Sequence, residues 1–319
     1  MEEAKKSLRS LVAEKQVFAP CVWDIMSSRA AKQAGFEATL LSGGCVAEWV
    51  CGLPDIGLMT ADDIVRATQY ITEAVDLPTC VDADDGYGET PLHAWRTTRR
   101  LVDAGASSLT LDDTTGYRGY NRWGEQLRGG ASDGTMIHPA VSRKIFLAKT
   151  KAALEACSGS DCMLIARTES KLQYGLEEAI ERCMLAEELG AEMTLVIGLM
   201  NLEEGEKVNE QLPGWKMWPD VGSRDGKPDV ELADIEKLGF NFVTCHILET
   251  AAMWGMIDFG KHACQERNLV YHDTHTMGLK PEEVEKGIVG MQKKGAKMGA
   301  DKYTQMEPHF WENLPGQDD

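Results

Sequence analysis

Short apolar runs alternate with helical segments along most of the chain. Four of these runs follow a helix that ends in glycine, and they span residues 38–43, 108–113, 193–198 and 242–246. A glycine just past a helix adopts the left-handed cap, and continuous apolar runs are typical of strands buried on both faces. Four more strand candidates lie between helical stretches, at residues 17–23, 79–84, 163–168 and 215–221.

The number and spacing of these units predict the fold class. Eight βα units in about 250 residues match the size of a (β/α)₈ barrel. We therefore predict an α/β protein, a single (β/α)₈ TIM barrel with a C-terminal helical extension. A doubly wound open sheet is the alternative, but no GxGxxG motif follows a first strand to support it. We expect a catalytic barrel domain at 1–260 and, at 261–319, a helical tail that forms oligomers.

The most informative stretch is Val81–Gly88, which ends an apolar strand in carboxylates and then turns on glycines. Alternate residues of a strand share a face, so Asp82 and Asp84 point the same way. Two convergent carboxylates are costly to hold without a cation or a set of donors. The stretch therefore predicts a hard-cation site at a strand end, where a barrel carries its chemistry. Capping of the following turn is the alternative, and for Asp85 it is the preferred interpretation.

Composition narrows the class of protein. The 319 residues are 43% hydrophobic, enough for a sizeable core, and the formal charge of -18 argues against nucleic acid and anionic membranes as partners. No run approaches the roughly 18 apolar residues of a membrane helix, and the N-terminus lacks the apolar core of a signal peptide, so we expect a cytoplasmic protein. The nine cysteines form no CxxC pair, which favours reduced thiols; Cys80 and Cys245 are expected in the core.

Five motifs in order resemble those of the isocitrate lyase/phosphoenolpyruvate mutase superfamily, over roughly residues 15–260. The motifs are Leu41–Gly44, Gly52–Gly57 with Thr60, Val81–Gly88, Leu111–Asp113 and Ile165–Glu169. The resemblance implies a Mg²⁺-dependent (β/α)₈ barrel that forms or consumes the enolate of a pyruvate-like acid. It implies Asp84 as the direct metal ligand, with Asp82 and Asp112 holding metal-bound waters. Mn²⁺ is the alternative metal, because it accepts the same oxygen ligands.

The resemblance also implies the substrate contacts. Arg167 would clamp a substrate carboxylate, and the backbone N–H groups of the Ser42, Gly43 and Gly44 segment would cradle its oxygens. Asp55 would be an acid/base or gate residue near the reacting carbon. Two alternatives stay open: Arg167 as a strand-end salt-bridge partner, and Asp55 as the start of an Asx turn.

The loop at 114–137 departs from the family pattern. Isocitrate and 2-methylisocitrate lyases carry a Lys-Lys/Arg-Cys-Gly-His loop whose cysteine is the proposed proton donor, but this chain has no cysteine between Cys80 and Cys157. In the phosphonate branch a gate lysine falls where this chain has Arg118. Arg118 and Arg122 together predict a gate that closes over an anionic substrate. A mobile surface loop is the alternative.

The leading hypothesis is a Mg²⁺-dependent carbon–carbon lyase that acts on a small 2-oxo or 2-hydroxy dicarboxylic acid through an enolate. One alternative is P–C bond chemistry of the phosphoenolpyruvate mutase or phosphonopyruvate hydrolase type, and another is a non-catalytic binding barrel. The expected partners are a small anionic carboxylate substrate and further copies of the chain, in a homotetramer or a dimer. For the His272–His275 cluster of the tail, a surface or interface role is preferred over metal binding.

Overall fold

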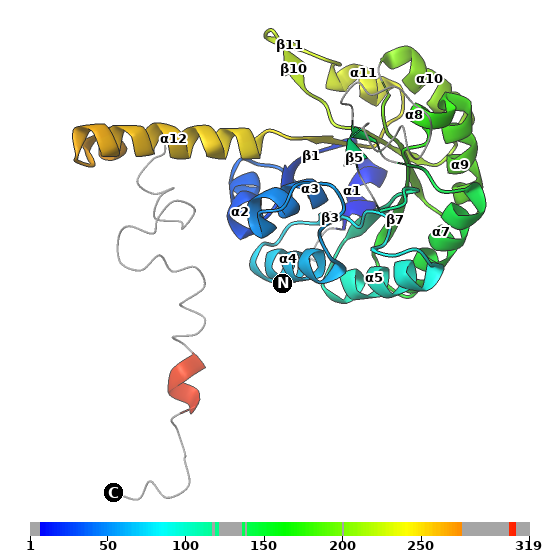
Figure 1. Cartoon of the computed structure of the whole chain (residues 1–319), viewed down its shortest axis with the longest axis horizontal. Coiled ribbons are helices and arrows are strands. Elements are labelled where there is room, and N and C mark those ends of the chain that lie inside the picture. Colours follow the sequence, from blue (N-terminus) through cyan, green and yellow to red (C-terminus); the bar gives the residue numbers. More distant parts are fainter. Residues whose placement is uncertain are drawn as a thin grey trace, which may run out of the picture. The chain divides into compact units, whose positions relative to one another are not determined.

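The computed structural model describes residues 7–116, 119–120, 136–137, 139–199, 201–275 and 306–310. The chain divides into two compact units, Met1–Ala252 and Met253–Asp319. In the first unit, eight parallel strands close into a barrel in the order β1-β12-β9-β8-β7-β4-β3-β2, and helices surround them (Figure 1). The predicted (β/α)₈ barrel is therefore confirmed, and closure excludes the doubly wound open sheet.

All eight predicted strands are barrel strands. They are β1 (Val17–Val22), β2 (Thr39–Leu41), β3 (Thr79–Asp82), β4 (Ser108–Leu111), β7 (Met163–Thr168), β8 (Met193–Val196), β9 (Trp215–Trp218) and β12 (Phe242–Cys245). Two short hairpins lie outside the barrel, β5 (Gly119–Tyr120) with β6 (Met136–Ile137), and β10 (Ser223–Arg224) with β11 (Lys227–Pro228).

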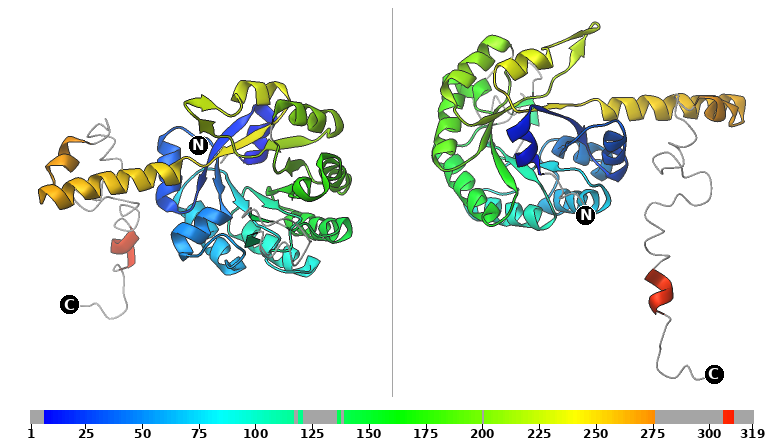
Figure 2. Two further views of the ribbon diagram at one scale, coloured as in Figure 1. Left: turned by 45° about the horizontal axis from the view of Figure 1, so that its top comes forward. Right: turned by 180° about the vertical axis from the view of Figure 1, so that it is seen from behind.

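The helices of the first unit form the outer ring, as two further views of the chain show (Figure 2). They are α2 (Ile25–Gln33), α3 (Gly43–Cys45) continued by the π-helix η1 (Val46–Cys51), α4 (Ala61–Ala74), α5 (Pro91–Asp103), α7 (Arg143–Cys157), α8 (Lys171–Tyr174), α9 (Leu176–Glu188), α10 (Leu202–Gln211) and α11 (Leu232–Lys237), whereas α1 (Leu8–Glu14) lies at one end of the barrel. Helix α12 (Leu248–Glu266) begins in the first unit, and α13 (Val270–Thr274) and a short helix at 306–310 belong to the second.

The hydrophobic core has two parts, one inside the barrel and one between the barrel and the surrounding helices. Cys80, Ile165 and Phe242 pack together in the barrel interior, whereas Val81 and Leu109 pack outward beneath the surrounding helices. Because side chains alternate along a strand, the position two residues beyond an interior residue is again interior. Every such position at a carboxyl strand end therefore faces the mouth of the barrel.

The opposite end of the barrel is closed by α1. Leu8, Leu11 and Val12 pack with the interior residue Val17, and the Leu8 N–H donates to Ser107 Oγ just before β4 (2.9 Å). The carboxyl end is thus the end at which the interior can meet a ligand.

Two further sequence expectations concern cysteines and membrane helices. All nine cysteines are free thiols, and Cys80 and Cys245 are buried, which confirms their core placement. Among the described helices, none combines the length and apolarity that crossing a bilayer requires.

A comparison of Gly86, in the turn after β3, with Gly35, between α2 and β2, tests how tightly that turn is packed. Gly35 and Gly86 both have positive φ, +94° and +86°, but an added Cβ meets nothing within 4 Å at Gly35 and lies 2.8 Å from the Ala94 Cα at Gly86. We expect Gly35→Ala to lower the free energy of unfolding by about 1 kcal/mol, from the left-handed backbone alone. Gly86→Ala should cost roughly 1–3 kcal/mol more, because backbone must shift. Urea unfolding measures both, and equal losses would contradict the packing argument.

Candidate functional site

A cavity of about 320 Å³ lies at the carboxyl ends of the barrel strands. Its lining residues are Leu40, Ser42, Gly44, Cys45, Glu48, Asp55, Asp82, Thr110, Arg167, Leu195, Ile197, Met217, Pro219, Asp220, Thr244, His246 and Glu249. The structure therefore brings five of the predicted site residues together around one space: Ser42, Gly44, Asp55, Asp82 and Arg167.

Arg167 is the central cation of this cavity. Its Nη1 lies 3.3 Å from both Asp82 carboxylate oxygens, and its Nε donates to Glu169 Oε1 at 3.0 Å. The side chains of Arg167 and Glu169 are only 14% and 2% exposed. Burial alone would lower the pKa of Arg167, but the carboxylates of Glu169, Asp82 and Asp112 outweigh it and raise the pKa well above its usual value. Arg167 therefore stays charged at the cavity wall. It is paired with Asp82 and Glu169 and also lines the cavity.

Two glycines allow carboxylates to approach the start of α3 closely. A Cβ on Gly43 would lie 3.3 Å from Asp84 Oδ2 and 3.4 Å from Asp82 Oδ2, and a Cβ on Gly44 would lie 3.0 Å from Asp55 Oδ2. Any larger residue would push these carboxylates away. The Ser-Gly-Gly motif thus holds three predicted functional carboxylates against one short stretch of backbone.

Asp84 and Asp112 meet beside this motif. Asp84 has a φ of +45°, which is uncommon for a residue other than glycine and is found at functional sites. The Asp112 N–H donates to the Asp84 carbonyl oxygen (2.8 Å), and Asp112 Oδ1 accepts from the Thr114 N–H (2.9 Å) and hydroxyl (2.7 Å). The loop after β3 and the end of β4 are therefore fixed to each other.

The donor set suits a hard divalent cation. Asp82, Asp84 and Asp112 offer carboxylate oxygens, the ligands that Mg²⁺ prefers, and Gly43 leaves free the space that a Cβ would take next to two of them. The three predicted residues therefore fit Mg²⁺ in chemistry, and Asp82 and Asp84 also have space beside Gly43. Their assignment as ligands stays a prediction.

Not every predicted contact lies within the described part of the chain. Arg118 and Arg122 fall outside the described residues, as does most of the predicted gate at 114–137. The Ser42 N–H donates to the Val22 carbonyl oxygen (3.1 Å), so a contribution of Ser42 to substrate binding would come from its hydroxyl. The amides of Gly43 and Gly44 lie in the first turn of α3.

Two carboxylates of the same motifs face outward and serve the scaffold. Asp85 accepts the Tyr87 N–H (2.9 Å), the turn capping expected from the sequence, and also pairs with the buried Lys149 Nζ of α7 (3.1 Å). Asp113 is fully buried, where it accepts from Arg182 Nη1 of α9 (2.9 Å) and from the Glu169 N–H (2.8 Å). Burial raises the pKa of Asp113.

A histidine and an aspartate that the sequence did not single out face the same cavity. His246 follows β12 and Asp220 follows β9, and His246 Nδ1 lies 2.7 Å from Asp220 Oδ2. Thr244 Oγ1 donates to Asp220 Oδ1, and Ser42 Oγ lies 3.4 Å from His246 Nε2. Their position at strand ends was the one signal in the sequence that they could belong to the site. Their pairing joins residues of different strands, so no local sequence motif marks it.

Two groups of possible metal ligands surround this histidine within the described residues: Cys21, Asp220 and His246, and Cys45, His246 and Glu249, each with ligand atoms within 4.8 Å of one another. The set Asp82, Asp84 and Asp112 is not one of these groups. In the predicted arrangement two of those carboxylates bind through water, so they need not lie that close together.

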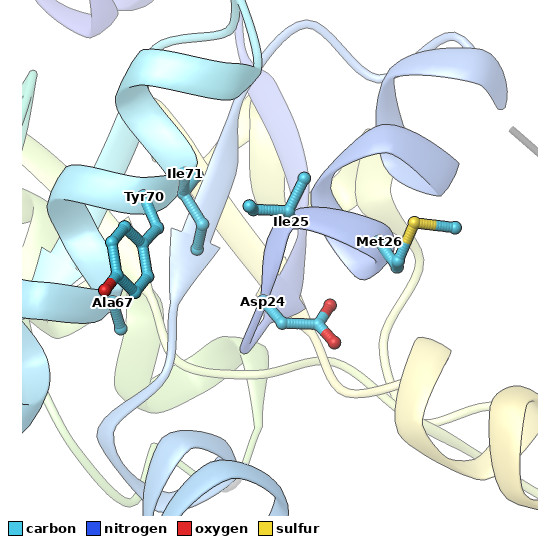
Figure 3. A pocket seen from close by; sticks show the side chains of 6 residues that line it. All are labelled: Asp24, Ile25, Met26, Ala67, Tyr70 and Ile71. Atoms are coloured by element: carbon cyan, nitrogen blue, oxygen red, sulfur yellow. The ribbon is translucent and has the colours of Figure 1, made fainter. Parts of the chain in front are cut away.

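A second cavity, of about 260 Å³, lies between the start of α2 and α4 (Figure 3). It is lined by Asp24, Ile25, Met26, Ala67, Tyr70 and Ile71. The Asp24 carboxylate already caps α2 by accepting the Ser27 N–H (2.7 Å), and the rest of the lining is mainly apolar. This cavity brings together none of the predicted site residues.

The fold and this strand-end constellation define an enzyme-type (β/α)₈ barrel with an acidic mouth. A family model described as phosphoenolpyruvate phosphomutase matches residues 8–259. The chain therefore belongs to this family, as the motifs predicted.

Relatives of known activity are similar over different lengths. The chain is 30% identical to 2,3-dimethylmalate lyase of Eubacterium barkeri over 255 residues, 80% of this chain and 82% of that protein. It is 36% identical to 2-methylisocitrate lyase of Escherichia coli strain K12 over 163 residues, 51% of each chain. These names support the prediction of a carbon–carbon lyase of this superfamily.

Solved structures match the fold of nearly the whole chain. An oxaloacetate acetylhydrolase in complex with the inhibitor 3,3-difluorooxalacetate matches with a TM-score of 0.76 at 21% identity, over 96% of this chain and 97% of that one. A phosphonopyruvate hydrolase in complex with oxalate and Mg²⁺ matches with a TM-score of 0.71 at 19% identity, over 95% and 96%.

The network behind β7 predicts a pH dependence of stability. Arg182, which holds Asp113, also donates to Glu178, and Arg143 pairs with Glu178 from the surface. The hydrogen bonds from Arg143 contribute most to lowering the pKa of Glu178 to about 2. Because the folded pKa is depressed, this stabilisation is present above the usual pKa of 4.5 and is lost as the pH falls toward 2. Glu178→Gln should therefore lower the free energy of unfolding at pH 7 and flatten its fall between pH 5 and pH 3.

Urea unfolding across this pH range measures the effect. Glu181→Gln is the matched control, because Glu181 pairs with the same Arg143 (3.2 Å) but is 44% exposed. An exposed pair of this kind contributes about 0–1 kcal/mol. If both variants gave the same pH profile, the role of Glu178 in the buried network would be excluded.

Proposed function

We propose that this chain is a Mg²⁺-dependent lyase that cleaves a carbon–carbon bond in a small 2-oxo or 2-hydroxy dicarboxylic acid through an enolate. The observation that carries the proposal is the strand-end cavity in which Arg167 lies between Asp82 and Glu169. The activities named for the relatives, on dimethylmalate, methylisocitrate and oxaloacetate, support the same class of substrate.

The proposed metal ligands are Asp84, directly, with Asp82 and Asp112 through water. When bound there, Mg²⁺ would supply a Lewis acid for the carboxylate and carbonyl oxygens of a 2-oxo acid. The orientation of Asp82 is fixed by the hydrogen bond that it accepts from Thr110 Oγ1 (3.1 Å) and by its ion pair with Arg167.

The chain's own residues would bind and orient the substrate. Arg167 would donate two hydrogen bonds to a substrate carboxylate, a geometry that its planar guanidinium favours. The hydroxyl of Ser42 and the amides of Gly43 and Gly44 would hold the remaining oxygens. Asp55, held against Gly44, would act as acid/base or gate, and Arg118 and Arg122 are proposed to close over the anion.

The proposal predicts metal-dependent binding of oxalate, a planar mimic of the pyruvate enolate. Calorimetry should detect oxalate binding with Mg²⁺ and none in EDTA. Asp84→Asn should weaken it at least tenfold, because the direct ligand loses its charge. Asp62→Asn is the matched control, since Asp62 is a 70% exposed surface partner of Arg100 and should bind oxalate like the wild type. Binding that is unchanged in EDTA, or in Asp84→Asn, would contradict the metal site.

Turnover decides between two chemistries. A lyase should release pyruvate, glyoxylate or CO₂ from a panel of 2-oxo and 2-hydroxy dicarboxylic acids. The second candidate is P–C bond chemistry, which the description of the matching family favours. A change in the ³¹P spectrum of phosphonopyruvate, with no turnover of the carboxylic acids, would select that candidate.

We also propose that the tail forms subunit contacts. Met253, Trp254 and Met256 of α12 are 46%, 65% and 57% exposed, a large apolar area for one short segment. Light scattering should give the mass of a dimer or tetramer, and Trp254→Glu with Met256→Glu should reduce it. Leu92→Glu, at a 78% exposed position of α5, is the control that should leave the mass unchanged. A monomeric wild-type protein would refute the proposal.

A further inference from the structure

The pair His246 and Asp220 has a geometry that general acid catalysis requires. Asp220 Oδ2 lies 2.7 Å from His246 Nδ1, and Thr244 Oγ1 holds the other carboxylate oxygen. With Nδ1 bound to the carboxylate, Nε2 is the nitrogen available on the other edge of the ring, where Ser42 Oγ lies at 3.4 Å. An aspartate that fixes one ring nitrogen orients the other toward a reacting group.

The pair follows strands that lie near β7, the strand of the proposed substrate clamp. Around the closed barrel, one strand, β8, separates β9 from β7, which carries Arg167, and two strands, β8 and β9, separate β12 from it. Both His246 and Asp220 line the same cavity as Arg167, and the His246 side chain is 39% exposed. A small acid held by Arg167 would therefore present its far end to His246.

Hydrogen-bond geometry favours this role over a metal site at the same residues. A tetrahedral zinc ion holds nitrogen and oxygen ligands at about 2.0–2.2 Å, which separates the two ligand atoms by roughly 3.4 Å. The 2.7 Å between His246 Nδ1 and Asp220 Oδ2 is instead the length of a charge-assisted hydrogen bond. His246 and Asp220 are therefore hydrogen-bonded to each other and do not share a metal ion.

We propose that His246, oriented by Asp220, is the general acid that protonates the carbon of the leaving enolate. This role rests on the proposed lyase function, and the chain has no cysteine between Cys80 and Cys157 that could donate a proton from the loop in between. Of the described residues lining the cavity, His246 is the single histidine. The pKa of His246 is raised far above its usual value, first by Asp220 and then by the thiols of Cys21 and Cys45, so the proton is present at neutral pH.

The proton and electron balance is simple. The carbon–carbon bond breaks and its electron pair stays on the carbon that becomes the enolate, which belongs to the departing fragment of a 2-hydroxy acid and to the fragment that remains when a 2-oxo acid loses CO₂. That pair takes the proton from Nε2, so a C–H bond forms, the N–H bond breaks, and His246 becomes neutral with Nδ1–H toward Asp220. A 2-hydroxy acid loses its hydroxyl proton to a base, for which Asp55 is the proposed group, and a 2-oxo acid releases CO₂. After cleavage of a 2-hydroxy acid, Asp55 releases its proton to solvent and His246 regains one, so no net proton is consumed. After decarboxylation, His246 takes a proton from water and hydroxide is left.

The test compares His246→Gln and Asp220→Asn with His262→Gln in the full-length protein. His262 is the matched control, because it also lies near an aspartate, Asp258 (3.7 Å), but is not one of the residues that line the cavity. The readouts are kcat and KM for whichever acids of the panel the wild type turns over, their pH profiles, and oxalate binding with Mg²⁺. His246→Gln should lower kcat by about 10²-fold, the usual contribution of a general acid, and should change the Kd for oxalate less than threefold.

Asp220→Asn gives a second, independent readout. His246 acts in its protonated form, and Asp220 raises its pKa, so activity should fall on the alkaline side at a lower pH in this variant. The other titratable groups around the ring are Cys21, Cys45 and Glu249, and all are unchanged in Asp220→Asn. Histidine NMR should show the same downward shift of the His246 pKa without any substrate, which keeps the test decisive if His246→Gln does not fold.

The outcomes separate this proposal from the proposed function. Wild-type turnover that survives His246→Gln with kcat within threefold, or an Asp220→Asn profile identical to wild type, would overturn the role of the pair alone. A wild-type protein that neither binds oxalate with Mg²⁺ nor turns over any acid of the panel would overturn the lyase function, and the assignment of His246 with it.

Discussion

Alternation of side chains in a closed barrel is the constraint on which the rest of this structure depends. Interior positions along each strand must be apolar where the barrel is filled, as Cys80, Ile165 and Phe242 are. Two residues further on, the same parity reaches the carboxyl mouth, where Asp82, Arg167 and Thr244 stand. The packing of the core therefore fixes which polar side chains can meet, before any of them makes a contact.

The charges at the mouth must then balance one another in a poorly solvated space. Arg167 is 14% exposed between Asp82 and Glu169, and removing either carboxylate would leave a buried charge without part of its compensation. The glycines at 43 and 44 let further carboxylates approach the same point. A site assembled in this way is rich in negative charge, which is the condition under which a divalent cation binds and a lone anion does not.

Much of this arrangement follows from local sequence, and the remainder does not. Glycine-ended helices and apolar runs predicted every barrel strand, and period two distinguishes Asp112, which faces the interior, from its neighbour Asp113, which pairs with Arg182 of α9. The pairing of Asp220 with His246 could not be predicted in this way. It joins the ends of β9 and β12, which are neighbours in the barrel but lie apart in the sequence, and Pro219 interrupts the alternation just before Asp220, so no local pattern marks the contact.

The cavity also limits what the proposed reaction can accept. Leu40, Leu195, Ile197 and Met217 line the space together with the charged groups, and at about 320 Å³ its volume is near the lower end of the range for small-molecule sites. Charged groups at different points of the wall with apolar side chains among them suit a short acid whose carboxylates are separated by carbon atoms, because each part of such a molecule finds a matching surface. The same apolar side chains lower the local dielectric, so a hydrogen bond from Arg167 or His246 to the proposed substrate would be stronger there than in water. In the proposed reaction, the same few strand-end positions would thus set the size, charge and orientation of the substrate.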